Sequence, residues 1–324
     1  MALDSDPLHA LLLDGEGGAR ALPPEQVDRW TPEQGLLWLH LDYTDPQAKH
    51  WLENHSGLPE LAVDALLAEN TRPRAVTLNQ HLLLALRGVN TNPGADPEDM
   101  VSIRLCVSAG RIISTRKRRL LSVVKLVDDL QQGQGPCNSA DLLVQLNERL
   151  VERMGQTVEN LDDELSELEL SLLTDAQSEM RHAVRNLRRQ CISLRRYYSP
   201  QRDAFNQLQS ERLEWLTTDH RLALREISDR LLRHIEDLDM LRERAAMAQE
   251  ELASQQSEQL NLRMYVLSII SAIFLPLGFL TGLLGINVGG IPGADNDNAF
   301  MMFLISLVLM VGGLFWLFRR WRWL

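Results

Sequence analysis

The segment GLLGINVGGIPGADNDN, which begins at Gly282, places one polar amide, Asn287, in a glycine-rich frame between two long apolar runs. Glycines adopt backbone conformations that other residues avoid, so they account for a turn. They do not account for the amide, whose side-chain oxygen is an acceptor that a cation can approach. Asp295 and Asp297 follow in the same segment. Their field would concentrate cations nearby, although an ordinary solvated loop explains them equally well.

A second set of small and polar residues recurs every three or four positions before Gly285. We call this set the polar stripe, because its spacing of about 3.5 residues places it on one face of a helix. Helix-to-helix contact through small residues explains Gly278 and Gly282 taken alone. A water-filled conduit that attracts cations explains the whole stripe. Its members are Glu236, Met240, Glu243, Met247, Glu250, Ser254, Ser257, Asn261, Met264, Ser268, Ser271, Leu275, Gly278 and Gly282.

Two segments are apolar enough to cross a bilayer. Residues 264–284 and 299–318 contain no Asp, Glu, Lys, Arg or His, and a membrane-spanning helix needs about 20 apolar residues. A buried hairpin of a soluble protein is the less favoured alternative. Because two spans cannot enclose a pore, a conduit along the polar stripe requires several copies around an axis.

Basic residues set the expected orientation of this hairpin. Arg263 precedes the first span, and three arginines lie in the tail 319–324. By the positive-inside rule both ends are cytoplasmic, and the loop 285–298 faces outward. The start of the chain is acidic and lacks the pattern of a signal peptide.

The first part of the chain, 1–200, is expected to form a cytoplasmic α/β and helical domain. LLWLHLD from Leu36 reads as a buried strand, and PELAVDALLAEN from Pro59 reads as a helix. Two hairpins are predicted, with turns at residues 79–80 and 108–110. The fold class is therefore α+β, with a mixed sheet, a helical stalk and a membrane hairpin. An acidic helix and then a basic helix, ended by Ser199-Pro200, are expected to pack antiparallel.

Residues 201–263 are expected to form a long stalk helix, because no proline or glycine occurs from Asp203 to Leu275. An apolar seam along this helix predicts side-by-side packing with other helices. His234 lies in the seam and is interpreted as a tolerated seam residue, not a ligand. The seam comprises Ile227, Leu231, His234, Leu238, Leu241, Ala245, Ala248 and Leu252.

Composition excludes several function classes. The chain has 324 residues, and its formal net charge of -11 argues against nucleic-acid binding, which depends on Lys and Arg. Three isolated cysteines predict neither a disulfide frame nor a zinc knuckle. His50 and His55, five positions apart on a predicted helix, are interpreted as surface residues. No nucleophile–base pair or phosphate loop stands out, so neither an enzyme nor a cofactor is predicted.

A C-terminal two-span hairpin whose first span ends in Gly285-Ile286-Asn287, after an acidic domain and a long helix, resembles the CorA metal-ion transporter superfamily. The continuation VGGIPG, with ENTRPRAV and RGVNTNPGADPEDMVSIRL earlier in the chain, is similar to its ZntB-type branch of bacterial zinc transporters. The resemblance implies a funnel-shaped homopentamer in the bacterial inner membrane. It also implies a pore lined by the first span, with Asn287 meeting a hydrated ion at the outer mouth.

The residues themselves do not indicate zinc, which prefers His and Cys ligands that the first span and its loop lack. The resemblance implies zinc, with cobalt, nickel, cadmium or magnesium as further ions, and proton-coupled uptake. A magnesium or cobalt channel is the alternative within the class. A membrane-anchored coiled-coil scaffold or sensor is the alternative from another class.

Overall fold

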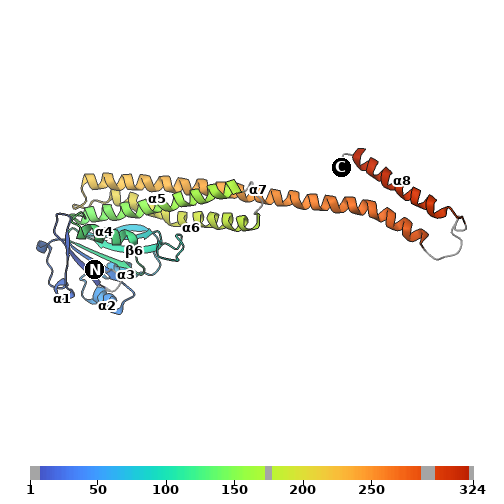
Figure 1. Ribbon diagram of the computed structural model, residues 1–324. Coiled ribbons are helices and arrows are strands. Elements are labelled where there is room, and N and C mark those ends of the chain that lie inside the picture. Colours follow the sequence, from blue (N-terminus) through green and yellow to red (C-terminus); the bar gives the residue numbers. More distant parts are fainter. Residues whose placement is uncertain (1–7, 172–176, 286–295, 321–324) are drawn as a thin grey trace. The chain divides into compact units, whose positions relative to one another are not determined.

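The structure is a computed structural model that describes residues 8–171, 177–285 and 296–320 (Figure 1). It divides into two compact units, Met1–Gln249 and Glu250–Leu324. The first unit contains a sheet and several helices, and the second contains two apolar helical segments. One long helix, α7 (Thr218–Leu284), contributes to both units.

A seven-stranded mixed sheet forms the centre of the first unit, in the order β2-β1-β3-β7-β6-β5-β4. β3 pairs with β7 in parallel, and every other described pair is antiparallel. The predicted mixed sheet is therefore confirmed. The strands are β1 (Leu8–Leu13), β2 (Ala19–Ala21), β3 (Leu37–Asp42), β4 (Arg74–Leu78), β5 (His81–Gly88), β6 (Val101–Val107) and β7 (Arg111–Arg116).

Both predicted hairpins are confirmed. β4 and β5 are joined by the two-residue turn Asn79-Gln80, and Leu78 pairs with His81. Asn79 has a φ of 55°, which two-residue hairpin turns require and which asparagine tolerates better than most residues. β6 and β7 are joined through residues 108–110, where Ser108 N–H donates to the carbonyl of Arg111 at 2.9 Å.

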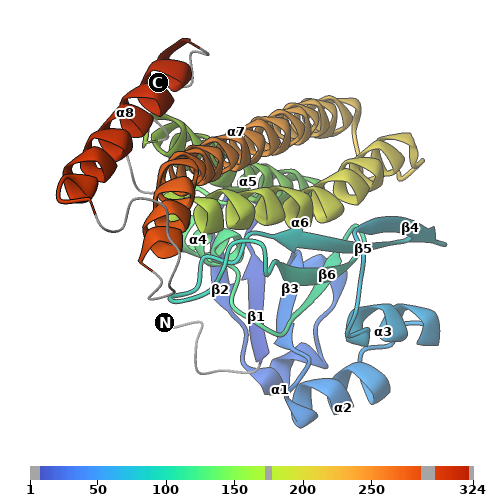
Figure 2. The same cartoon turned by 90° about the vertical axis from the view of Figure 1, so that its right-hand side faces the viewer.

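Helices cover the two faces of the sheet (Figure 2). The central strands β3, β5, β6 and β7 are mostly buried on both sides, as expected for a sheet between two layers of helices. On one face lie α1, α2 and α3, and their core includes Leu39, Leu52 and Leu66, each at most 1% exposed. On the other face lie α4 and the longer helices. The short helices are α1 (Pro24–Val27), η1 (Pro32–Gln34), α2 (Pro46–Asn54), α3 (Glu60–Leu67) and α4 (Leu121–Gln131).

Three long helices, α5 (Ser139–Ser171), α6 (Gln177–Ser210) and the first part of α7, lie side by side in the first unit (Figures 1 and 2). The predicted apolar seam of α7 is confirmed, since its apolar members are at most 5% exposed. α5 and α6 also pack together, and the Tyr198 hydroxyl donates to the carbonyl of Met154 at 3.3 Å. Their charged side chains form ion pairs with α7, as described below.

Two predicted helix boundaries are wrong. α6 does not end at Ser199-Pro200 but continues to Ser210, with Pro200 inside it. An interior proline costs about 3 kcal/mol, and here the following turns bury Phe205 and Leu208 completely, which offsets that cost. The long helix begins at Thr218 and not at residue 201, because the chain leaves the helical conformation between α6 and α7.

The second unit contains the end of α7 and α8 (Ala299–Arg320). Both helices are long and apolar enough to cross a membrane, and the most apolar window of each has no buried side chains. Pro276 lies inside α7. Because proline has no N–H, the carbonyl of Ala272, four residues earlier, has no helical donor.

Candidate ion-permeation surface

The polar stripe is exposed along its whole length. In the first unit α7 buries one side against neighbouring helices, where Leu238 and Leu241 are each 1% exposed. On the opposite side Met240 is 53% and Met247 is 61% exposed, and Glu236 and Glu243 are exposed with them. Thioether and carboxylate groups therefore alternate on a face that the described part of this chain does not cover.

Ion pairs fix which side of α7 faces outward. Arg244 donates to Glu169 of α5 at 2.7 Å and contacts Asp162 on the same helix. These carboxylates hold the pKa of Arg244 above its usual value, with the hydrogen bond that Arg244 donates to Glu169 as the largest cause. Arg195 of α6 lies 2.7 Å from Asp239 of α7. Because these pairs join α7 to both neighbours, a rotation of α7 about its own axis would break them.

His234 packs closely against Gly155 of α5. A Cβ built on Gly155 would lie 2.7 Å from both Cε1 and Nε2 of the His234 ring, which is closer than carbon and nitrogen atoms can approach. Burial lowers the pKa of His234. The interpretation of His234 as a seam residue therefore agrees with its surroundings, and the absent side chain of Gly155 makes room for its ring.

The apolar part of α7 presents hydroxyl groups that are bonded within the helix. Ser268 donates to the carbonyl of Met264, and Ser271 donates to that of Leu267, both at 2.8 Å. Each hydroxyl oxygen keeps acceptor lone pairs directed outward from the helix. A Cβ built on Gly278 or Gly282 would meet nothing within 4 Å. Asn261, Met264 and Leu275 are exposed on the same stripe.

The end of α7 requires a glycine. The N–H of Gly285 donates to the carbonyl of Thr281 at 2.9 Å, and a Cβ at Gly285 would lie only 2.8 Å from that oxygen. Ile286, Asn287 and Asp295 lie outside the described residues. Asp297 is described and exposed.

No group of three or more His, Cys, Asp or Glu side chains stands at metal-binding positions in residues 8–171, 177–285 and 296–320. Along the apolar part of the stripe, residues 264–282, the oxygen ligands available are hydroxyl and carbonyl groups. They bind a cation weakly, and weak binding lets an ion both enter and leave.

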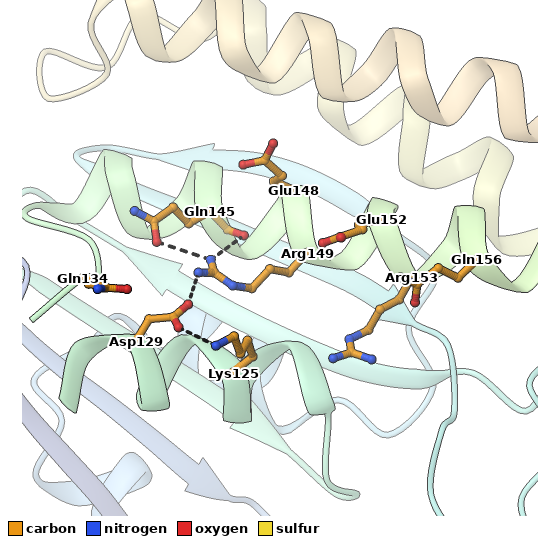
Figure 3. A pocket seen from close by; sticks show the side chains of 9 residues that line it. All are labelled: Lys125, Asp129, Gln134, Gln145, Glu148, Arg149, Glu152, Arg153 and Gln156. Carbon is orange, nitrogen blue, oxygen red and sulfur yellow. Dashed lines mark hydrogen bonds and ion pairs between the residues drawn. The ribbon is translucent and has the colours of Figure 1, made fainter. Parts of the chain in front are cut away.

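A polar groove of about 620 Å³ lies between α4 and α5 (Figure 3), and none of its lining residues belongs to the polar stripe. Its central carboxylate, Asp129, accepts from Arg149 and lies 2.8 Å from Lys125. These two cations hold the pKa of Asp129 below its usual value against the opposing effect of burial, which is the largest single influence. Lys125 and Arg149 thus neutralise the charge of Asp129.

Sequence reasoning located the polar stripe but missed the residues that orient it. Asp162 and Arg244 are 82 positions apart, so no local pattern connects them. The opposite charges of the acidic and basic helices within residues 139–210 indicated that these two helices pair with each other. They did not indicate that both form ion pairs with α7.

Comparisons with known proteins agree over almost the whole chain. A model of the family described as CorA-like Mg2+ transporter protein matches residues 33–320. The zinc transport protein ZntB of Yersinia enterocolitica is 41% identical over 320 residues, covering 99% of this chain and 97% of its own. The divalent cation transporter CmaX of Pseudomonas aeruginosa is 42% identical over 325 residues, covering 98% and 96%. The solved full-length structure of CmaX covers 99% of this chain and 100% of its own, with 40% identity and a TM-score of 0.86.

Proposed function

Because this chain belongs to the CorA-like family of metal-ion transporters and is a divalent-cation transporter, we propose that zinc is its main cargo. Identical copies, five in the assembly that the family resemblance implies, surround a conduit lined by the polar stripe of α7. The choice of zinc rests on the names of relatives about 40% identical to this chain, and not on ligand chemistry.

The observation that carries the conduit is the exposure of Met240 and Met247 on the side of α7 opposite its packed seam. Long apolar side chains more than half exposed on an anchored helix call for a partner. Because Glu236, one turn before Met240, and Glu243, between the two methionines, are charged, a uniformly apolar interface does not fit. A passage whose wall alternates thioether and carboxylate groups accounts for the exposed methionines and for the charged glutamates. The carboxylates attract cations, and the thioethers constrict the path.

The ligand set favours an ion that keeps much of its water. The hydroxyls of Ser268 and Ser271 supply neutral oxygens along the apolar part of the stripe. Asn287 contributes a ring of amide oxygens at the outer mouth in this proposal, and Asp295 and Asp297 concentrate cations there. The carboxylates of Glu236, Glu243 and Glu250 attract ions at the inner end.

The proposed location is the bacterial inner membrane, with both chain ends in the cytoplasm. Arg319 and Arg320 at the end of α8 support this orientation by the positive-inside rule. In this proposal proton coupling uses groups outside the bilayer, because the described spans contain no Asp, Glu or His. Hydrated ions and the carboxylates at both ends are the candidates.

Flux into liposomes tests the proposal. Purified full-length protein is reconstituted, and zinc entry is measured with and without an imposed pH gradient, for wild type, Asn287→Ala and the matched pore variant Ser271→Ala. We expect wild type to carry zinc and Asn287→Ala to be impaired more than Ser271→Ala. Equal zinc entry for wild type and Asn287→Ala would contradict the proposed role of Asn287 at the outer mouth. No flux of zinc, magnesium or cobalt would favour a scaffold or sensor.

A further inference from the structure

Two exposed histidines meet at the end of α2, on the face of the sheet opposite the long helices. The ring centroids of His50 and His55 are 5.6 Å apart and their planes are inclined by 56°. α2 ends at Asn54, so His55 leaves the helix with a φ of -124° while its N–H still donates to the carbonyl of Trp51 at 2.8 Å. This final turn carries the second ring back over the first, which a spacing of five on a regular helix would not do.

The separation of the rings suits one metal ion between them. A zinc ion bound about 2.1 Å from a ring nitrogen lies roughly 3.2 Å from the centroid of that ring, so tetrahedral coordination places two centroids about 5.2 Å apart. The observed 5.6 Å corresponds to only a slightly wider angle at the metal.

A carboxylate lines the same pocket as the two rings. His50, His55 and Asp28 line one open pocket of about 390 Å³ together with Gln47 and Trp51. The indole N–H of Trp51 donates to Oδ1 of Asp28 at 3.1 Å, which fixes the position of this carboxylate in the wall of the pocket. In the described ranges no three such side chains already form a metal cluster, so water completes the coordination.

We propose that His50 and His55 form a binding site for a divalent transition-metal ion of the zinc class, with Asp28 accepting a hydrogen bond from a metal-bound water. Imidazole nitrogens select zinc, copper or nickel over magnesium, which prefers oxygen ligands. The site lies in the first unit on α2 and shares no residue with the polar stripe. It is therefore independent of the proposed conduit.

Asn54 is the neighbour that must adjust when the metal binds. Its amide nitrogen lies 3.1 Å from Nδ1 of His50. When Nε2 of His50 binds the ion, Nδ1 carries the proton. The exposed amide of Asn54 then rotates so that its oxygen accepts a hydrogen bond from Nδ1–H, and it gives up the bond that its nitrogen donates to the carbonyl of His50 at 3.0 Å. Ligating histidines commonly donate their second N–H to such an acceptor.

Residue-resolved chemical protection tests the site in the full-length protein in detergent. Diethyl pyrocarbonate modifies free imidazoles, and peptide mass spectrometry gives the rate for each histidine with zinc, with magnesium or with neither. His182, exposed on α6, is the internal control. At a zinc concentration about ten times the Kd, we expect modification of His50 and His55 to slow about tenfold, with His182 and the magnesium sample unchanged.

The variants His50→Gln and His55→Gln decide whether the two rings share one ion. Both positions are exposed, so neither substitution disturbs packing. In His50→Gln we expect zinc no longer to slow the modification of His55. In His55→Gln we expect zinc no longer to slow the modification of His50. The proposal is overturned if zinc protects neither ring in wild type, or if each ring stays protected when the other is removed. Neither result depends on whether the protein transports zinc.

Discussion

Acid should destabilise the first unit through His40, which is 4% exposed in the central sheet. Its Nδ1 lies 2.8 Å from the hydroxyl of Ser114. Burial, with smaller effects from Arg116 and His9, lowers its pKa from 6.5 to about 3. The folded protein therefore keeps this ring neutral at pH values where an unfolded chain protonates it.

The size of the effect follows from the two pKa values. A histidine whose pKa is lowered by folding contributes its full share of stability above pH 6.5, and this share is lost as the pH falls toward 3. Linkage gives a loss of about 2 kcal/mol at pH 5 and about 3 kcal/mol at pH 4. Other groups titrate in the same range, so the effect of His40 is the difference between wild type and a variant that cannot titrate there.

His40→Leu is a suitable variant, because Ser114 keeps partners without the ring. The Ser114 hydroxyl accepts from Nε1 of Trp38 at 2.9 Å and donates to the carbonyl of Leu39 at 3.2 Å. Hydrogen exchange of the β3 and β7 amides in full-length protein, corrected for intrinsic rates, reports the opening free energy at pH 7 and pH 5. We expect wild type to lose about 2 kcal/mol more than His40→Leu. Equal losses would refute the reasoning. The result also sets the pH range in which flux assays report transport by a folded protein.

Two further variants test the packing and the charge of α7. Gly155→Ala should destabilise the first unit by about 1 kcal/mol despite the better helix propensity of alanine, because its Cβ would collide with His234. Thermal unfolding of the single variants and of the rescue pair Gly155→Ala/His234→Ala checks this, and a double variant whose loss of stability equals the sum of the two single losses would contradict it. Replacing Glu236, Glu243 and Glu250 together by Gln should reduce zinc flux at low salt. The reduction should be smaller at high salt, because dissolved ions already screen the field of these carboxylates, and a loss of flux that does not depend on salt would exclude an electrostatic role.

Local sequence patterns predicted the parts of this fold that depend on local physics. The turn at Asn79-Gln80 and the seam of α7 follow from alternation and helical spacing, and both are present in the structure. The path of α6 through Pro200 was not predictable in this way, since it depends on burial of Phe205 by distant segments.

The candidate sites also differ in how far local sequence patterns predict them. The polar stripe was readable because it is periodic on one helix, but the direction in which it faces depends on ion pairs such as Arg244 with Glu169, 75 positions apart. The meeting of His50 and His55 depends on where α2 ends, to within one residue. Sequence patterns do not define helix ends that sharply.

The central claim is that the polar stripe of α7 surrounds a wet passage, and cysteine accessibility tests it most directly. Burial raises the pKa of Cys106 and of Cys191 to about 11, so both are unreactive, and only the exposed Cys137 needs replacement by serine. In that background, single cysteines are placed at Ser271 on the stripe or at Phe274 off it.

Charged thiol reagents are then applied to reconstituted protein while zinc flux is recorded. The account predicts rapid modification and loss of flux for the cysteine at position 271, and slow modification with flux retained for the one at position 274. Modification and block at position 274 with position 271 protected would place the stripe against lipid or protein and contradict the account.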